Sequence, residues 1–276
     1  MASRSGRRPR SRAVQNALKR GIEGPIALVA LLVLAPIMVV IALLIVIESP
    51  GPVFYRAERV GYRGRRLRML KFRKMHPGAA GSALTLAGDA RLTRVGRVLS
   101  CSRLDELPQL WHVVRGQMSI VGPRPEDPRF VARYERDYAE ILRVRPGLTG
   151  WTQIAFAKER DVLDPSDPVE HYVQRILPQK IGLDRMYAAS PTLARDGRIL
   201  WSTILVAVAQ RAVAVDRATG TMTPRRRPRL NGADAGTAMA FHRQTSMELS
   251  VRSAAQTSAD SPGTASRTPA SNVMSP

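Results

Sequence analysis

The sequence predicts an α+β fold, in which an apolar N-terminal helix precedes a small, mostly helical domain with short strands. Three observations support this class. Residues 25–47 carry no charge, and as a helix they would be about 35 Å long at roughly 1.5 Å per residue. Residues 53–55 and 67–73 are typical of short strands, with Gly61 and Gly64 supplying a turn. Later segments repeat apolar residues at helical spacing and predict amphipathic surface helices.

The composition divides the chain into four parts. Residues 1–20 form a basic arm with seven Arg and Lys residues and no acid, and residues 21–47 contain the apolar helix. Residues 48–217 form the folded domain. Residues 218–276 predict a disordered tail, because 35 of these 59 residues are Ala, Ser, Thr, Gly or Pro.

The formal net charge of +21 alone favours either nucleic acid or an anionic membrane surface as a partner. The excess positive charge is localised, since residues 1–20 and 48–75 each carry a net charge of +7 and flank the apolar helix. Residues 76–217 carry only +4, and aromatic residues, which stack on bases, are 5% of the chain. We therefore expect the charge to bind anionic membrane lipids, and we expect no nucleic acid partner.

The apolar helix is long enough to cross a bilayer, and hydropathy alone favours a simple spanning anchor. Both flanks are basic, however, and basic flanks prefer the cytoplasmic side of a membrane. Pro36 lies near the middle of the run, where proline bends a helix. A re-entrant helix that bends at Pro36 and enters and leaves one leaflet satisfies both observations. A kinked spanning helix is the alternative, because membrane helices tolerate proline.

The adjacent carboxylates of Asp105 and Glu106 are the strongest candidates for chemistry. Pro108 follows them, and proline is tolerated only in the first turn of a helix, so a helix should begin near Leu104 or Asp105. Neighbouring side chains on a helix point about 100° apart, which favours two different roles. One carboxylate can attack phosphorus while the other holds a metal or moves a proton. Mg²⁺ held by these carboxylates and by phosphate oxygens is the expected cofactor, whereas ordinary helix capping is the structural alternative.

Several cations could bind a phosphate group near this dyad. Arg124 lies between two prolines, which fixes its backbone for bidentate phosphate binding. Lys71 and Arg73 alternate along a predicted strand and should share one face. A further polar cluster, which could equally be a surface salt-bridge network, comprises Asp89, Arg91 and Arg94.

Over roughly residues 17–213 the chain resembles the bacterial sugar transferase family, the monotopic phosphoglycosyl transferases that act on polyprenyl phosphate. Each matching motif is weak alone, but the ordered series is specific. After the proline-bent helix the motifs are Gly51–Tyr55, Arg59–Gly61, Lys71–Arg73, Asp89–Arg97, Leu104–Leu110, Met118–Pro125 and Arg145–Gly150.

The resemblance implies a re-entrant membrane helix joined to a catalytic domain at the cytoplasmic face of the bacterial inner membrane. It implies transfer of a sugar 1-phosphate from a nucleotide sugar, usually a UDP-sugar, to polyprenyl phosphate, which initiates surface glycan synthesis such as exopolysaccharide. In this family the Asp matching Asp105 attacks the β-phosphate, and the Glu matching Glu106 assists with Mg²⁺ nearby. We expect both carboxylates to hold the metal. The residues expected to bind substrate are Lys71, Arg73, Asp89, Arg91, Arg94 and Arg124.

The chain departs from the family pattern near the dyad and at the membrane bend. Ser100 stands where the family usually has Arg, and Arg103 stands where it usually has Ser. At the bend, Ala35 precedes Pro36 in place of the usual Ser. The changes at Ser100 and Arg103 define the alternative function, a catalytically impaired membrane-bound homologue that acts as a scaffold or regulator.

Overall fold

The computed structural model describes residues 9–81, 84–86, 88–157, 159–164, 166–207, 213–216 and 219–224. The start of the predicted basic arm and the predicted tail from residue 225 onward lie outside these residues. The α-helices are α1 Pro9–Glu48, α2 Arg94–Ser102, α3 Leu110–Val114, α4 Pro128–Arg133, α5 Glu135–Ile141, α6 Trp151–Ala155, α7 Pro168–His171, α8 Leu177–Ala189 and α9 Leu193–Ala207. Shorter helical segments are η1 Tyr62–Gly64, η2 Leu104–Gln109, η3 Glu159–Asp161 and η4 Tyr172–Ile176. The strands are β1 Phe54–Val60, β2 Arg66–Phe72, β3 Ser119–Val121, β4 Gly147–Thr149, β5 Val213–Val215 and β6 Met222–Pro224.

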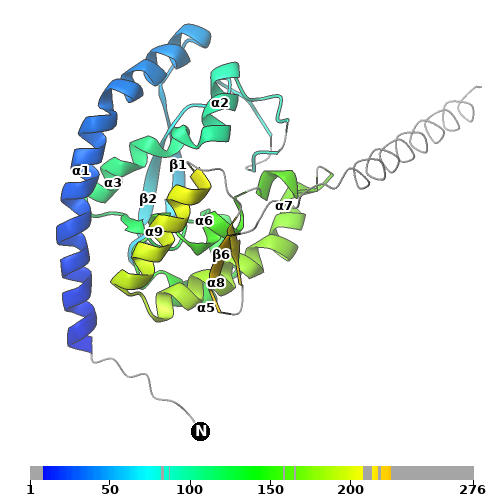
Figure 1. Cartoon of the computed structure of the whole chain (residues 1–276). Helices are drawn as coiled ribbons and strands as arrows, with labels where there is room; N and C mark the ends of the chain where they lie inside the picture. Colours follow the sequence, from blue (N-terminus) through cyan, green and yellow to red (C-terminus); the bar gives the residue numbers. More distant parts are fainter. Residues whose placement is uncertain are drawn as a thin grey trace, which may run out of the picture. The chain divides into compact units, whose positions relative to one another are not determined.

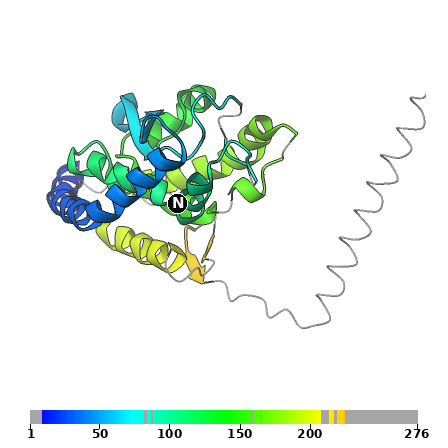
Figure 2. The ribbon, with the colours of Figure 1, turned by 90° about the horizontal axis from the view of Figure 1, so that it is seen from above.

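The apolar segment forms part of one long helix, α1, which stays helical through both Pro25 and Pro36. Figures 1 and 2 show that its axis changes direction along its length, with the later part turning across one end of the domain. Only 11% of its most apolar stretch is buried against protein. A core helix of a soluble protein would be mostly buried, so the exposed apolar surface indicates membrane association.

The N-terminal end of α1 is attached to the domain by partly buried polar contacts. Lys19 donates to the Val121 carbonyl oxygen at 2.7 Å and pairs with Asp196 of α9 at 2.8 Å. Glu23 accepts hydrogen bonds from the Ser119 hydroxyl at 2.6 Å and from the backbone N–H of Ile120 at 3.1 Å. These contacts hold the start of α1 against β3 and α9.

The C-terminal end of α1 is attached to the same domain. Ile41 and Ile45 are buried against Phe72 of β2 and Leu99 of α2. Glu48, the last helical residue, accepts hydrogen bonds from the first two backbone N–H groups of α2 at 2.6 and 2.8 Å. The N–H groups at a helix start have no partner within the helix, so this carboxylate satisfies them.

Three two-stranded sheets complete the fold. β1 and β2 form an antiparallel hairpin with Phe54 opposite Phe72 and Val60 opposite Arg66, which confirms the two strands predicted on either side of the glycine turn. β3 and β4 pair in parallel, so the chain between them returns through α4 and α5. β5 and β6 pair antiparallel. Strand β6 occupies residues 222–224, inside the segment predicted as a tail.

The amphipathic helices are shorter than the sequence pattern suggests. The pattern of residues 130–141 predicts one helix, but the structure divides it into α4 and α5 at Tyr134, whose φ of −132° and ψ of 42° are not helical. Ser190 and Pro191 are typical of a helix start, and the helix that follows them is α9, which begins at Leu193. Its exposed apolar residues include Trp201, 62% exposed, which fits the surface helix predicted from its short apolar run.

Gly96 permits a close approach between α2 and the chain that follows β2. A Cβ atom at Gly96 would lie 1.8 Å from the backbone carbonyl oxygen of Lys74, whereas a Cβ at Gly182 on α8 would meet no atom within 4 Å. Gly96→Ala should therefore lower the free energy of unfolding by about 2–3 kcal/mol, because the backbone must shift. Gly182→Ala should raise it by about 0.5–1 kcal/mol. Denaturation of both variants in detergent measures the difference, and equal stabilities would contradict the predicted close approach.

Candidate active site

The segment that carries the two candidate carboxylates begins with an unusual backbone conformation. Arg103, between α2 and η2, has a φ of +58° and lies in the left-handed region, which non-glycine residues seldom adopt. Strained conformations of this kind cluster at functional sites. The helical segment begins at Leu104, which confirms the start predicted from Pro108. It is a 3₁₀ turn that leads into α3 at Leu110.

The Glu106 carboxylate is held by two cations from distant parts of the chain. Lys71 of β2 donates to Oε1 of Glu106 at 2.9 Å. Arg124 donates to the same oxygen through Nη2 at 2.5 Å and to Oε2 through Nη1 at 3.4 Å. Burial raises the pKa of Glu106, but attraction to Arg124 and Lys71 and their hydrogen bonds outweigh burial and hold this pKa well below its ordinary value. Glu106 is therefore ionised at neutral pH.

The Asp105 carboxylate is buried, with 4% of its surface exposed, and differs from Glu106 in its surroundings. Within the described part of the chain it accepts no hydrogen bond. Burial, followed by repulsion from Glu106, raises its pKa, while Lys71, Lys74 and Arg124 counteract the rise. A carboxylate that lacks hydrogen bonds and solvent is a better nucleophile than one held in ion pairs. The two adjacent acids thus have the different environments that two roles require.

Further cations lie around the dyad. Burial lowers the pKa of Lys74, and attraction to Asp105 is the largest effect opposing it. Burial and repulsion from Arg124 lower the pKa of Arg103, while Glu106 and Asp105 raise it. Arg160 also repels Arg103. Together with Lys71 and Arg124, Lys74 and Arg103 place four cations around the two carboxylates, an excess that suits an anionic ligand.

Arg73 does not join this group. Its guanidinium donates to the carbonyl oxygens of Pro50 at 3.2 Å and of Ile45 at 3.5 Å, and also to that of Ser49. The sequence pattern predicts Lys71 and Arg73 on one face of a strand; β2 ends at Phe72, and the two side chains bind different partners. Beyond the strand, carbonyl oxygens at and just after the end of α1 bind the guanidinium. Substrate binding by Arg73 stays a prediction.

The predicted polar cluster before α2 holds a loop together. Arg91 pairs with Asp89 at 2.6 Å and donates to the Leu84 carbonyl oxygen at 3.0 Å. The hydrogen bonds from Arg91 lower the pKa of Asp89 to about 2. The backbone N–H of Arg94 donates to Glu48, and its side chain is exposed. Direct contact of these three residues with substrate stays a prediction.

Lys74 and Arg160 are candidate site residues that the sequence reasoning missed. Lys74 could have been found, because it follows Lys71 by three residues at the end of the hairpin. Arg160 stands 55 residues after Asp105, in a segment without any motif, and only the fold brings it to the end of α2.

A buried polar network links segments that lie next to the candidate site. Glu126, two residues after Arg124, accepts from the Tyr172 hydroxyl at 2.6 Å. Lys180 donates to the same hydroxyl at 3.2 Å and forms an ion pair with Glu159. Burial raises the pKa of the neighbouring Asp184 to about 8. The network joins the segment that carries Arg124 to the segment that carries Arg160.

The dyad fits a metal ion only together with a ligand. No group of three or more His, Cys, Asp and Glu side chains gathers as a metal site within the described residues. Mg²⁺, however, commonly uses one or two carboxylates and completes its shell with substrate phosphate oxygens and water. The unpaired Asp105 carboxylate fits such a site. The Glu106 oxygens are already shared with Lys71 and Arg124, so Glu106 could contribute only partially.

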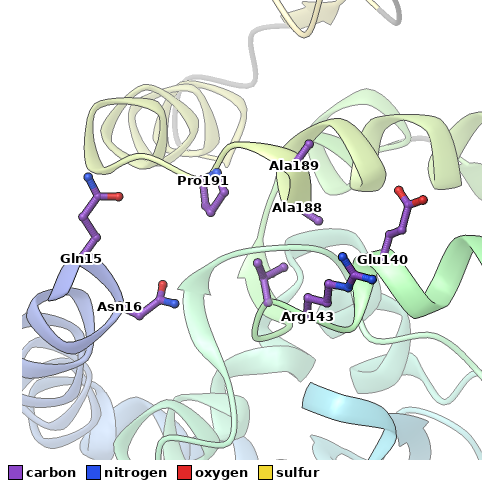
Figure 3. Close-up of a pocket in the computed structure, with 8 residues that line it drawn as sticks. Gln15, Asn16, Glu140, Arg143, Ala188, Ala189 and Pro191 are labelled. Carbon is purple, nitrogen blue, oxygen red and sulfur yellow. The ribbon is translucent and has the colours of Figure 1, made fainter. Parts of the chain in front are cut away.

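Two cavities of the domain lie away from the dyad. One of about 330 Å³ is lined by Gln15 and Asn16 of α1, Glu140 and Arg143 near α5, and Pro191 before α9 (Figure 3). A second of about 460 Å³ also includes Arg143. Neither is lined by a residue of the dyad or by the cations around it. The charge arrangement, and not cavity volume, therefore identifies the candidate site.

Comparison with known proteins is consistent with this geometry. The family model described as bacterial sugar transferase matches residues 14–210. A UDP-glucose:undecaprenyl-phosphate glucose-1-phosphate transferase of Caulobacter vibrioides is 37% identical over 202 residues, which cover 71% of this chain and 72% of the relative. A UDP-N-acetylgalactosamine-undecaprenyl-phosphate N-acetylgalactosaminephosphotransferase of Aeromonas hydrophila is 40% identical over 159 residues, 56% of this chain and 38% of the relative. The exopolysaccharide production protein PSS of Rhizobium leguminosarum is 36% identical over 197 residues, which cover 68% of this chain and 94% of the relative. The matched part thus spans less than half of the Aeromonas protein and most of the other two.

Proposed function

This chain belongs to the bacterial sugar transferase family, whose model matches residues 14–210, and from that premise we propose that it transfers a sugar 1-phosphate from a UDP-sugar to undecaprenyl phosphate. The names of the Caulobacter and Aeromonas relatives both describe this class of reaction. The Rhizobium relative is named for exopolysaccharide production. We place this chain at the first membrane-bound step in the synthesis of such a glycan.

One observation carries the proposal: a buried Asp105 carboxylate, which accepts no hydrogen bond from the described residues, stands beside an ion-paired Glu106 and among the cations Lys71, Lys74, Arg103 and Arg124. In the first step an oxygen of Asp105 attacks the β-phosphorus of the donor. The bond between that phosphorus and the bridging oxygen breaks, and UMP leaves with the electron pair. The sugar phosphate is then bound to Asp105 as an acyl phosphate.

In the second step a phosphate oxygen of undecaprenyl phosphate attacks the same phosphorus. The bond to Asp105 breaks, which frees the carboxylate and yields the lipid diphosphate sugar. Lys71 and Arg124 stabilise the negative charge on the phosphate oxygens in both steps, and they keep Glu106 ionised. Mg²⁺, bound by Asp105 or Glu106 with phosphate oxygens, would supply further charge neutralisation.

Release of UMP tests the proposal directly. Full-length protein in detergent with undecaprenyl phosphate should release UMP from at least one UDP-sugar of a panel that includes UDP-glucose and UDP-N-acetylgalactosamine. EDTA should stop turnover, and added Mg²⁺ should restore it. A protein that folds and binds the membrane, yet releases no UMP from any donor, would support the scaffold alternative instead. The assembled dyad and its cations favour the enzyme over that alternative.

We propose a re-entrant path for α1, with the domain on the cytoplasmic face of the inner membrane. Lys19 and Glu23 before the apolar segment, and Glu48 after it, all bind polar groups of one domain. A helix that crossed the bilayer would place these ends on opposite sides of a hydrocarbon layer about 30 Å thick. The change in helix direction in Figure 1 supports a path that returns to the same side.

Cysteine labelling tests this topology. In a Cys101→Ser background, which removes the one native cysteine, the variants Arg10→Cys and Ala80→Cys should both resist a membrane-impermeant maleimide in intact spheroplasts. Both should react after lysis, because both positions then lie in the cytoplasm. Labelling of one position alone in intact spheroplasts would establish a spanning helix.

A further inference from the structure

Three arginines from distant segments converge near the turn that follows α3. Nε of Arg145, in the loop before β4, donates to the Gly116 carbonyl oxygen at 2.9 Å. A Cβ atom at Gly116 would lie 3.0 Å from Nη2 of Arg20 on α1, so that guanidinium lies against the same turn. The guanidinium carbons of Arg145 and Arg63 lie 4.8 and 5.1 Å from the ring centre of Tyr62. We call Arg20, Arg63 and Arg145 the arginine cluster.

The arginine cluster has no carboxylate partner within the described part of the chain, where none of its three guanidinium groups forms an ion pair. Burial, followed by repulsion from Arg20, lowers the pKa of Arg145, and Arg63 adds to that repulsion. Glu23 attracts Arg145, but the Ser119 hydroxyl already donates to both Glu23 oxygens. Cations held this close together are stabilised when an anion binds between them.

A cavity of about 460 Å³ adjoins the cluster. It is lined by Tyr62, Arg63, Gly64, Ala139, Leu142 and Arg143. The backbone N–H of Arg63 donates to the Leu142 carbonyl oxygen at 2.9 Å, which holds η1 against the end of α5. Arg143, labelled in Figure 3, adds an exposed guanidinium to the lining. A cavity lined by cations and apolar side chains, without an acid among its lining residues, suits an anionic group that carries an apolar attachment.

The position of Arg20 on α1 sets the depth of the cluster in the membrane. Arg20 precedes Pro25, where the uncharged run begins, by a helix length of about 8 Å at roughly 1.5 Å per residue. The headgroup layer on each side of the hydrocarbon core is roughly 5–8 Å deep. The cluster therefore lies at the level of the lipid headgroups, whether α1 returns to the same side or spans the membrane.

We propose that the arginine cluster binds the phosphate of an anionic phospholipid headgroup. The phosphate oxygens accept hydrogen bonds from the three guanidinium groups, and the glycerol lies in the adjoining cavity. Binding of this kind requires neither substrate of the proposed transfer, so the site goes beyond that function. It also differs from a diffuse attraction of the basic flanks to lipid, because Arg145 lies outside residues 1–20 and 48–75. A free phosphate ion shares this chemistry, and a titration separates the two sources.

The experiment is a titration of full-length protein in detergent with dihexanoyl phosphatidylglycerol, a short-chain anionic phospholipid, measured by microscale thermophoresis. Arg145→Gln and Arg63→Gln should each raise the Kd about 10- to 100-fold, because each substitution removes charge-assisted hydrogen bonds to the phosphate. The matched control is Arg68→Gln. It removes an exposed arginine of β2 from the same basic flank and should change the Kd less than twofold.

Two further ligands define the headgroup. Dihexanoyl phosphatidylcholine, whose headgroup has no net charge, and inorganic phosphate, which has no apolar attachment, should each bind the native protein at least about tenfold more weakly than phosphatidylglycerol. Inorganic phosphate that binds as tightly as phosphatidylglycerol would assign the cluster to a free anion and overturn the proposal. Equal affinity for the two phospholipids would overturn it as well.

The variants separate a specific site from general charge and from misfolding. The Arg63 side chain makes no hydrogen bond to any described residue, so Arg63→Gln should unfold at the native temperature and still lose affinity for phosphatidylglycerol. Native affinity in both Arg63→Gln and Arg145→Gln would exclude the cluster as the site. A loss of affinity in Arg68→Gln equal to that in the cluster variants would also contradict the proposal, because diffuse attraction would then account for binding.

Discussion

Asp105→Asn is expected to abolish sugar-phosphate transfer and to remove the covalent adduct that forms with a donor labelled in its β-phosphate. An amide cannot act as the nucleophile, and loss of the nucleophile commonly costs about 10⁴-fold or more in kcat. The substitution preserves the size of the side chain, and no described group donates a hydrogen bond to the native carboxylate. The variant should therefore fold normally.

The matched control for this experiment is Asp137→Asn. Asp137 is an aspartate of α5 that pairs with Arg185 on the exposed surface, and it should retain the native rate and the adduct. Transfer by Asp105→Asn within tenfold of the native rate would exclude Asp105 as the nucleophile. A labelled adduct in that variant, with transfer lost, would assign the covalent bond to another residue and contradict the mechanism equally.

Arg124→Met is expected to lower kcat by about 10²- to 10³-fold, as removal of a single electrostatic donor does in comparable sites. Arg124 lowers the pKa of both Glu106 and Asp105. Removal of the Arg124 guanidinium should raise both pKa values, so the two carboxylates become protonated at higher pH. Because the proposed chemistry requires ionised carboxylates, the acid limb of the pH–rate profile should move to higher pH.

The matched control for Arg124→Met is Arg129→Met. Arg129 lies five residues later, is 69% exposed and pairs with Asp127, so its loss should change neither the rate nor the profile. A reduced rate with an acid limb that stays in place would contradict the effect of Arg124 on the carboxylates. A native rate would exclude Arg124 from the site.

The parts of this molecule that could be predicted from sequence are those set by local chemistry. Pro108 restricts where a helix can begin, and the structure begins η2 at Leu104 as expected. The glycine turn correctly separates two strands, because the hairpin forms from neighbouring residues. The identity of the dyad was predictable for the same reason, since Asp105 and Glu106 are adjacent in the chain.

The partners of the dyad could be predicted only in part, because they come from distant segments. Lys71 and Arg124 do meet at Glu106, although no local rule requires it. Arg73 belongs to the same motif as Lys71, yet carbonyl oxygens at the end of α1 bind it. Arg160 has no sequence pattern at all. Contacts of this kind depend on tertiary packing, which local patterns do not encode.

The link between α1 and α2 connects the membrane segment mechanically to the candidate site. Glu48 joins the end of α1 to the first turn of α2, and that nine-residue helix ends two residues before Leu104, next to the proposed nucleophile. A change in the angle or depth at which α1 lies in the lipid would move Glu48, and α2 would pass that movement to the backbone that carries Asp105. We therefore expect the transfer rate to vary with the lipids around α1, without any molecule binding at the candidate site.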